Sequence, residues 1–334
     1  MQLKNLISRG TFWRRIIQYG FLFWCVYIGI VFGIFVQQFR TSGLATIPRP
    51  PSVEAFLPIG SLISFRYWLD TGIVHTFHPA GLVLFVTFVV MSLLAKKSFC
   101  SFVCPVGTVS ERFWKGGERL FGRTWMPYRW IDTSLRSLKY MLLYFFLSIT
   151  FFKMPAVAIK PFLNSSYWAI ADVKMLDFFT GISLLAIIII AALALLSIPY
   201  RNFWCRYLCP YGALVGLASF FSPWKVRRNE KTCIGCGTCG RVCPSYLPVD
   251  KKSVVRSVEC TGCLTCVSNC PEDRALAMSI PFWNRPLPAW VFPAFVLTVF
   301  AIGVGWGMAS GHWHTSLTSA DYKTLISMAD RIGH

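Results

Sequence analysis

Long apolar stretches alternate with basic segments along this chain of 334 residues. A hydrocarbon core of about 30 Å takes about 20 apolar residues in a helix. Five stretches approach that length, at residues 16–36, 74–95, 140–153, 178–197 and 287–309. The third begins at Tyr140 and is short before Lys153, whose long side chain can reach the interface. The pattern predicts an α-helical membrane protein with about five transmembrane helices.

The basic residues predict how these helices are oriented. Of the 33 Lys and Arg residues, 25 fall before the first span, between the second and third, and between the fourth and fifth. The positive-inside rule places these segments in the cytoplasm. The formal net charge of +19 therefore reflects topology rather than nucleic-acid binding. We expect a prokaryotic cytoplasmic-membrane protein that crosses the lipid several times, with its C-terminus at His334 outside.

Eight cysteines form two runs of the pattern C-x2-C-x2-C-x3-C-P, which is typical of bacterial ferredoxins with [4Fe–4S] clusters. In two-cluster ferredoxins the fourth cysteine of each run binds the other cluster. We therefore predict two crossed ligand sets. Cluster 1 takes Cys233, Cys236, Cys239 and Cys270, and cluster 2 takes Cys260, Cys263, Cys266 and Cys243.

The same pairs of cysteines also suit structural zinc, which is the alternative to iron. Zinc requires only four sulfurs per site and has no use for the regular x3-C-P ending. The spacing therefore favours two [4Fe–4S] clusters. Free thiolates need a reducing compartment, which agrees with a cytoplasmic ferredoxin-like insert.

A second cysteine motif is duplicated. Cys100-Ser-Phe-Val-Cys104-Pro recurs as Cys205-Arg-Tyr-Leu-Cys209-Pro, and both cysteines are offset by 105 residues. Each copy follows a span that is predicted to run inwards, which suggests a parallel repeat. Cysteines four apart on a helix face the same way, but their Cβ atoms are too far apart for a good disulfide.

We call Cys100, Cys104, Cys205 and Cys209 the CxxxCP thiols, and predict that they hold a third iron–sulfur cluster or another metal. A thiol redox site or a copper site is one alternative. A set of small buried residues is the other. Lys96, Lys97, Arg201 and Arg206 lie close enough in sequence to offset thiolate charge.

Two histidines, His75 and His78, lie near the outer end of the second predicted span, close to Tyr67 and Asp70. An ionisable residue at membrane depth is a functional candidate, and histidine has a suitable pKa for accepting a proton. These four residues are therefore candidates for a quinol site. An interfacial histidine pair bonded to loop carbonyls is the alternative, and haem or metal ligation is another.

The motifs divide the chain into four consecutive parts. Residues 1–73 are predicted as an N-terminal anchor helix with an external loop, and 74–224 as a membrane core with two CxxxCP repeats. Residues 225–286 form a double [4Fe–4S] ferredoxin domain. Residues 287–334 form the fifth transmembrane helix and an external tail.

With several spans, two CxxxCP motifs and a double ferredoxin insert, the chain resembles the membrane polyferredoxins over about residues 75–280. These include the quinol-dehydrogenase subunit of periplasmic nitrate reductase, part of a nitrous-oxide-reductase accessory protein, and an oxidase-assembly ferredoxin. The fifth span and its tail depart from the nitrate-reductase pattern. The resemblance implies electron transfer between membrane quinol and a redox partner outside the membrane.

The expected function is therefore that of a redox subunit in a quinol-dependent oxidoreductase complex of a respiratory chain. Its cofactors are two or three iron–sulfur clusters, with quinone as a further candidate. Its expected partners are other subunits, above all an external cytochrome c or iron–sulfur protein. The alternative is an assembly factor that reduces copper or thiols through the CxxxCP cysteines. The sequence leaves the direction of electron flow open.

Overall fold

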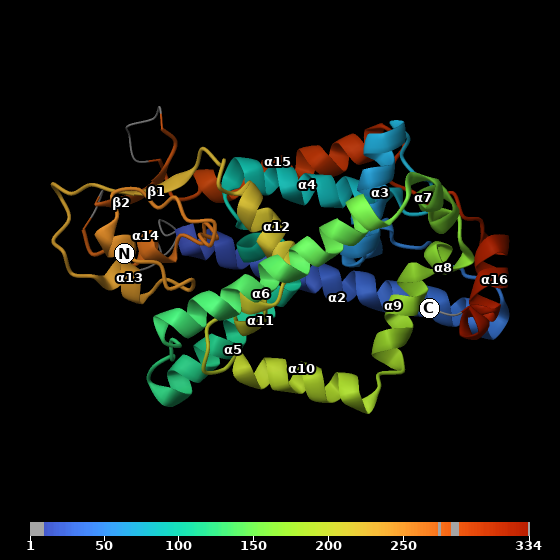
Figure 1. Cartoon of the computed structure of the whole chain (residues 1–334), viewed down its shortest axis with the longest axis horizontal. Coiled ribbons are helices and arrows are strands. Elements are labelled where there is room, and N and C mark those ends of the chain that lie inside the picture. Colours follow the sequence, from blue (N-terminus) through green and yellow to red (C-terminus); the bar gives the residue numbers. More distant parts are fainter. Residues whose placement is uncertain (1–9, 273–274, 282–286, 333–334) are drawn as a thin grey trace. The chain divides into compact units, whose positions relative to one another are not determined.

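The structure is a computed structural model and describes residues 10–272, 275–281 and 287–332 (Figure 1). The predicted start at residue 1, the basic residue Arg285 and the C-terminal His334 lie outside the described residues. The protein is mostly helical, and its α-helices are α2 (Gly10–Ser42), α3 (Pro58–Thr71), α4 (Pro79–Ala95), α5 (Pro105–Phe121), α6 (Arg129–Ser148), α7 (Ala156–Leu163), α8 (Ser166–Ala169), α9 (Ala171–Thr180), α10 (Leu184–Leu196), α11 (Phe203–Tyr207), α12 (Pro210–Ala218), α13 (Thr238–Arg241), α14 (Thr265–Ser268), α15 (Val291–Ala309) and α16 (Ser319–Ser327). The other elements are the π-helical turns η2 (Phe99–Val103) and η3 (Ile149–Lys153), the 3-10 turns η1 (Pro51–Phe56), η4 (Val249–Lys251) and η5 (Ala329–Arg331), and the strands β1 (Lys225–Arg228) and β2 (Leu276–Ser279).

The chain forms two compact units, each built from three separate segments. Unit 1 comprises Met1–Phe23, Phe88–Leu143 and Ala191–Phe300, and unit 2 comprises Trp24–Thr87, Tyr144–Ile190 and Ala301–His334. Unit 1 therefore contains both cysteine motifs, and unit 2 contains both histidines of the predicted quinol site. The division into four consecutive domains stays a prediction.

Three helices are long and apolar enough to cross a membrane: Gly10–Ser42, Arg129–Lys153 and Val291–Ala309. The first contains the first predicted span, and the last forms the fifth predicted span but begins at Val291 rather than at residue 287. The third predicted span was expected to be short, and this was wrong because its helix begins at Arg129 rather than at Tyr140. The added turns carry charged residues, and two of them, Asp132 and Lys139, are buried against partners in unit 1.

The other two predicted spans differ from single long helices. Residues 178–197 were expected to form one span, but α9 and α10 meet at an angle of 82°. The break lies at Gly181, which ends α9, and the hydroxyl of Ser183 then accepts a hydrogen bond from the Ala186 amide in α10. The second span was predicted to start at residue 74, but α4 starts at Pro79 because proline favours a first helical position. The structure thus has three candidate spans, or four if the bent pair is one span.

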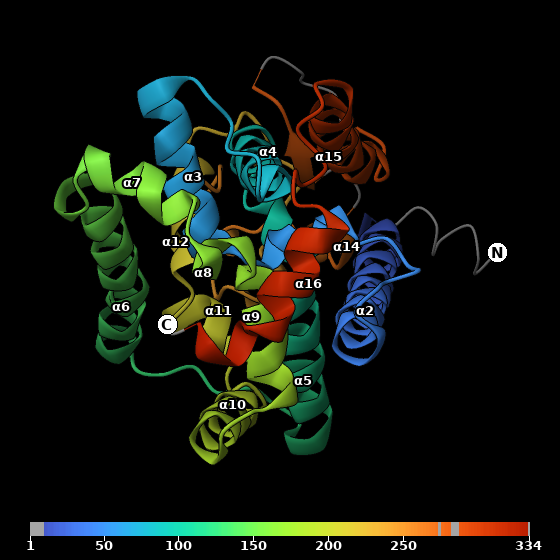
Figure 2. The same ribbon diagram turned by 90° about the vertical axis from the view of Figure 1, so that its right-hand side faces the viewer.

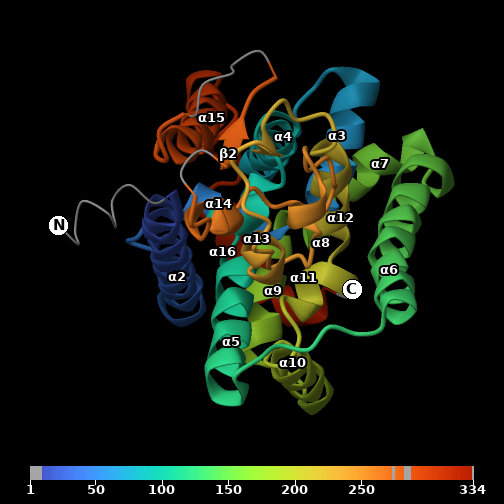
Figure 3. The ribbon, with the colours of Figure 1, turned by 90° about the vertical axis from the view of Figure 1, so that its left-hand side faces the viewer.

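The ferredoxin part of unit 1 is a small two-stranded sheet with two short helices (Figure 1). β1 and β2 pair antiparallel, with Lys225 opposite Ser279 and Arg228 opposite Leu276. Figure 3 looks onto α13 and α14, which contact each other. α13 begins two residues after Cys236, and α14 begins two residues after Cys263, so each helix follows the second cysteine of its run. The sheet and the two helices therefore fix the positions of both runs.

Unit 2 has an aromatic core and a buried group of charges. Phe35 of α2 packs edge-on against Tyr322 of α16, with ring centroids 5.3 Å apart, and Figure 2 shows α16 beside α9. The Arg49 guanidinium contacts both Glu54 and Asp172, at 2.8 and 2.7 Å. All three side chains are buried, so one cation offsets two carboxylates inside this unit.

Candidate functional site

Two cavities in unit 1 are each lined by four of the ferredoxin cysteines. We call them the first and the second ferredoxin cavity. The first is lined by Cys233, Cys236, Cys239 and Cys270. The second is lined by Cys243, Cys260, Cys263 and Cys266. Each set combines three cysteines of one run with the fourth of the other, as the crossed arrangement requires.

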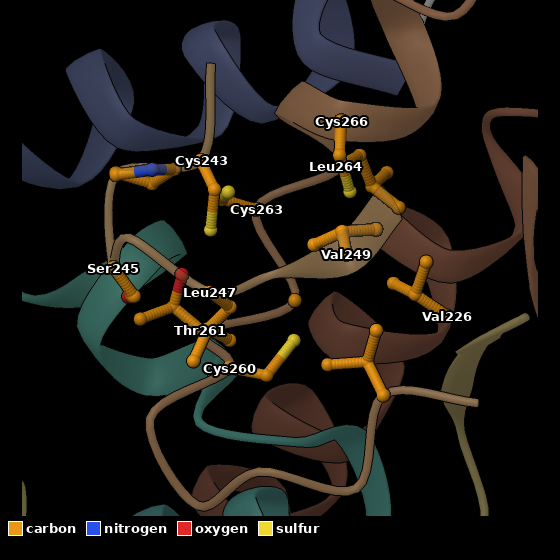
Figure 4. Close-up of a pocket in the computed structure, with 13 residues that line it drawn as sticks. Val226, Cys243, Ser245, Leu247, Val249, Cys260, Thr261, Cys263, Leu264 and Cys266 are labelled. Atoms are coloured by element: carbon orange, nitrogen blue, oxygen red, sulfur yellow. The ribbon is translucent and has the colours of Figure 1, made fainter. Parts of the chain in front are cut away.

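The second ferredoxin cavity is shown in Figure 4, where the side chains of its cysteines surround one space. Leu247, Val249 and Leu264 complete much of its wall. Apolar walls exclude water from sulfur ligands, and burial is one of the factors that sets the potential of an iron–sulfur cluster.

The two cysteine loops have matching backbones. The residue before the second cysteine of each run has a positive φ, at Gly235 (72°) and Gly262 (64°). The residue after that cysteine does too, at Gly237 (69°) and Leu264 (59°). A positive φ is unfavourable for leucine, and Leu264 is held there with its side chain buried. Both loops therefore wrap their cysteines around the cavity in the same way.

Donor groups point at the sulfurs of the first ferredoxin cavity. The amide of Gly235 and the guanidinium of Arg228 hydrogen-bond to Cys233 and lower the pKa of its thiol. The hydroxyl and amide of Thr238 lower the pKa of Cys236 in the same way. Such donors stabilise thiolates, which are the form that binds iron. Four converging cysteines with these donors fit a [4Fe–4S] cluster, which would supply one-electron transfer.

The two cavities differ in exposure. Cys236 is exposed, whereas Cys243, Cys260 and Cys266 are buried. Burial raises the pKa of Cys243 to about 12, and it raises the pKa of Cys260 and Cys266 as well. The first ferredoxin cavity is therefore the solvent-accessible one, and the second is internal to unit 1.

The two CxxxCP motifs have the same local geometry. The amide of Cys104 donates to the Phe99 carbonyl at 2.9 Å, and the amide of Cys209 donates to the Trp204 carbonyl at 3.1 Å. Phe99 and Trp204 occupy the same position in the two copies of the motif, 105 residues apart. Each second cysteine is then extended, and the proline that follows begins a new helix, α5 or α12.

The first turns of these new helices donate to cysteine sulfur. The Gly212 amide donates to Cys209 Sγ at 3.2 Å, and the Val106 and Gly107 amides donate to the Cys104 sulfur. At Gly107 a Cβ atom would lie 2.3 Å from the Cys100 carbonyl oxygen, so a side chain there would clash with the motif. Both motifs thus place a cysteine at the positive end of a helix, which favours the thiolate.

The CxxxCP thiols interact electrostatically with one another across the two motifs. Cys205 interacts with the other three, and Cys100 and Cys104 each interact with Cys209. Burial raises the pKa of Cys100 to about 11 and that of Cys104 to about 12. Four neutral thiols or a metal-bound set both satisfy this environment. Among the described residues, no three His, Cys, Asp or Glu side chains are spaced for a single metal ion.

A hydrogen bond joins the first CxxxCP motif to the second ferredoxin cavity. The hydroxyl of Ser101, which follows Cys100, donates to the Thr261 carbonyl at 2.6 Å. Thr261 follows Cys260 and lines the cavity. The segment that contains Cys100 and Cys104 is therefore in direct contact with the segment that contains Cys260.

Glu259 lies beside this contact and is surrounded by cations. Its carboxylate accepts from Lys139 Nζ at 2.6 Å and from the Tyr140 hydroxyl at 3.1 Å, and Lys97 Nζ lies 3.8 Å away. Burial alone would raise the pKa of Glu259, but Lys97 and Lys139 outweigh it and lower the pKa to about 2.

We expect Glu259→Gln to destabilise the protein on the order of 3 kcal/mol, because two buried lysines lose their counterion. The contribution of the ionised carboxylate should be present above pH 4.5 and lost as the pH falls towards 2, since its pKa is lowered in the folded state. Urea unfolding of both proteins at pH 7 and pH 3 tests this. Equal stability of the two proteins at pH 7 would contradict it.

The expected countercharges do not all serve the CxxxCP thiols. Lys97 does interact with Cys100 and Cys205. Arg201 instead donates to the Cys243 carbonyl at 3.0 Å, and Arg206 donates to the Ser245 carbonyl at 2.9 Å. Both arginines therefore hold the ferredoxin loop. Sequence reasoning missed Glu259, although its place next to Cys260 was a signal.

Three of the four predicted quinol-site residues lie near one another in unit 2. His75 packs against Tyr67 at a centroid distance of 6.1 Å, and its Nε2 is 3.3 Å from Asn164 Oδ1. His78 is close enough to interact electrostatically with His75, and both of its ring nitrogens are engaged, with the Trp168 carbonyl at 2.7 Å and with Arg49. Asp70 is exposed and forms an ion pair with the buried Arg66. His75 with Tyr67 therefore keeps a ring nitrogen available, whereas Asp70 is directed at Arg66.

Comparison with family models supports the cysteine sites. A 4Fe-4S binding domain model matches twice, at residues 77–125 and 182–229, and each match contains one CxxxCP motif. A 4Fe-4S dicluster domain model matches residues 225–271, which include both ferredoxin runs in full. No solved structure matches the chain.

The chain is similar to a putative electron transport protein and to ferredoxin-type proteins. It is 44% identical to the putative electron transport protein YccM of Escherichia coli over 331 residues, covering 97% of this chain and 92% of the relative. It is 25% identical to the ferredoxin-type protein NapH of Haemophilus influenzae, covering 79% of this chain and 88% of the relative. A methylamine utilization ferredoxin-type protein, MauN of Paracoccus denitrificans, is 28% identical over 46% of this chain and 50% of the relative. The chain therefore belongs to the membrane polyferredoxin family and is an electron transport protein with 4Fe-4S binding domains.

Proposed function

We propose that this protein carries electrons between membrane quinol and a redox partner through three iron–sulfur centres in unit 1. The observation that carries the proposal is the 2.6 Å hydrogen bond from Ser101 to the Thr261 carbonyl. It joins the CxxxCP motif to the loop of the second ferredoxin cavity. The order of centres is then the CxxxCP site, cluster 2 and cluster 1.

The difference in exposure supports this order. Cluster 2 has buried ligands, which suits an internal relay between two other centres. Cluster 1 has the exposed Cys236 and lies beside exposed basic residues such as Lys231 and Arg241. These charges favour exchange of electrons with an acidic partner at that end.

A third cluster at the CxxxCP thiols is the first centre in this order. The repeated motif geometry and the two matches of one family model, themselves 105 residues apart at their starts, support a duplicated site. Helix amides and Lys97 offset the charge of the four thiolates. The relatives named NapH and MauN are ferredoxin-type proteins, which agrees with this role.

His75 with Tyr67 is the candidate for the quinol site. Oxidation of one quinol to quinone releases two electrons and two protons, and two clusters take one electron each. His75 Nδ1 accepts only a long bond from the Phe77 amide, at 3.4 Å, so it is placed to take a proton. His78 is already held on both ring nitrogens.

The proposed setting is the inner membrane, with the ferredoxin part in the cytoplasm and the C-terminus outside. The candidate spanning helices and the NapH-like relatives support a membrane location. The basic segments of unit 1 support its cytoplasmic side through the positive-inside rule. Partners in a larger redox complex follow from this placement.

The test is anaerobic addition of a reduced quinol analogue to the purified protein in vesicles. We expect the visible absorbance of oxidised clusters to bleach. A scaffold role predicts no bleaching although iron is bound. The assembly-factor alternative predicts instead that copper(II) is reduced to copper(I), and that this reduction disappears in Cys100→Ala and Cys205→Ala variants.

A further inference from the structure

Lys96 is a buried lysine beside the second ferredoxin cavity. It directly follows α4, and its relative exposure is 0%. Among the described residues, Nζ of Lys96 has no hydrogen-bond acceptor. Burying an ammonium ion without a counter-charge is highly unfavourable, so such a group needs an explanation.

The backbone around Lys96 holds it firmly in this position. Lys96 has a positive φ of 59°, and its amide donates to the Ser222 hydroxyl at 2.9 Å. That hydroxyl in turn lies 3.0 Å from the Leu94 carbonyl, to which it donates. The Ser222 hydroxyl therefore fixes the backbone on the N-terminal side of Lys96.

The stem of Lys96 packs behind the wall of the second ferredoxin cavity. A Cβ atom on Gly262, which lines that cavity, would lie 3.4 Å from Lys96 Cβ and 3.0 Å from the Phe292 ring. Only a glycine leaves Lys96 and Phe292 this close to the cysteine loop. The lysine is thus separated from the cavity by a single layer of backbone.

The charged groups around Lys96 indicate which of them its ammonium group stabilises. Burial lowers the pKa of Lys96, and the neighbouring cation Lys225 lowers it further, whereas Cys260 raises it. Cys260 is a cluster 2 ligand in the proposed function. Lys97, the next residue, has Glu259 as its anion, so the two lysines serve different groups.

We infer that the Lys96 ammonium is the resident countercharge of cluster 2 and raises the reduction potential of that cluster. The inference rests on the iron–sulfur assignment in the proposed function. A cluster with four thiolate ligands carries net negative charge, and reduction adds one more negative charge. A fixed cation that is separated from the cluster only by buried backbone stabilises the reduced form more than the oxidised form, because little water screens its charge.

The test is redox potentiometry of the iron-loaded protein, followed by electron paramagnetic resonance. In Lys96→Met we expect one of the two ferredoxin potentials to fall by at least 59 mV, which is a tenfold change in the one-electron equilibrium. The other potential should stay unchanged. Lys96→Gln serves as a second neutral variant if the first one loses iron.

Two control variants make the result specific. Lys225→Met removes the same charge from a half-buried position, where water reaches the side chain and should screen its effect to well below tenfold. Arg228→Gln removes the donor to Cys233, and should lower the potential that Lys96→Met leaves unchanged. An iron-loaded Lys96→Met protein with unshifted potentials, or with both shifted equally, would overturn the inference. A wild-type protein without cluster signals would instead refute the proposed function.

Discussion

Cys270→Ala is expected to abolish the signal of the cluster that Cys233, Cys236 and Cys239 hold, although Cys270 belongs to the other cysteine run. The reason is that Cys270 lines the first ferredoxin cavity and Cys243 lines the second. Losing a thiolate from a four-cysteine site leaves one iron without its ligand. Electron paramagnetic resonance of the reduced variant should show loss of most of one signal, with damage to the second because both runs share one small fold.

The matched control is Cys25→Ala, which removes a cysteine of α2 that belongs to neither ferredoxin run. Both cluster signals should survive in that variant. The reciprocal variant, Cys243→Ala, should abolish the signal that depends on Cys260. If the Cys233 cluster is intact in Cys270→Ala while the Cys260 cluster is lost, the ligands are not crossed.

Cys205→Ala is expected to remove an entire redox centre while both ferredoxin clusters remain. The wild-type protein should contain more than the eight iron atoms that two [4Fe–4S] clusters require. The variant should return to about eight, because a thiolate from each CxxxCP motif is needed to close the shared site. Iron and sulfide analysis of both proteins, purified without oxygen, measures this.

The iron count also defines the result that would contradict a third cluster. A fully loaded wild-type protein with eight iron atoms and four alkylatable thiols at Cys100, Cys104, Cys205 and Cys209 would contradict a third cluster. Loss of all iron in Cys205→Ala would point to misfolding. Cys205→Ser then provides a smaller change at the same position, with the same iron count expected.

Sequence spacing groups the eight ferredoxin cysteines into the same two sets of four that line the two cavities, and their binding of clusters stays a prediction. In each ferredoxin run the first three cysteines are only three residues apart in sequence, so spacing alone predicts a shared site. The crossed fourth ligands agree with the cavities that Cys243 and Cys270 line. Leu264 shows the limit of this reasoning: nothing in the sequence indicates that it replaces the glycine of the other loop at a positive φ.

The charges around the sites were harder to predict, because their directions depend on single backbone turns. Lys96 and Lys97 are adjacent in sequence, yet Lys97 pairs with Glu259, whereas Lys96, at a positive φ, has no acceptor for its ammonium group among the described residues. Arg201 and Arg206 bind loop carbonyls that lie far away in sequence. Likewise, hydropathy alone did not locate the break at Gly181 or the helix start at Arg129.

The central claim is that electrons enter the ferredoxin clusters by way of the CxxxCP site. The most direct measurement is rapid-freeze electron paramagnetic resonance after mixing reduced quinol with wild-type protein and with Cys205→Ala. The wild type should show reduced ferredoxin clusters within one turnover. The variant should stay oxidised with quinol and still be reduced by dithionite. Ferredoxin clusters that quinol reduces at the same rate in both proteins would contradict the claim.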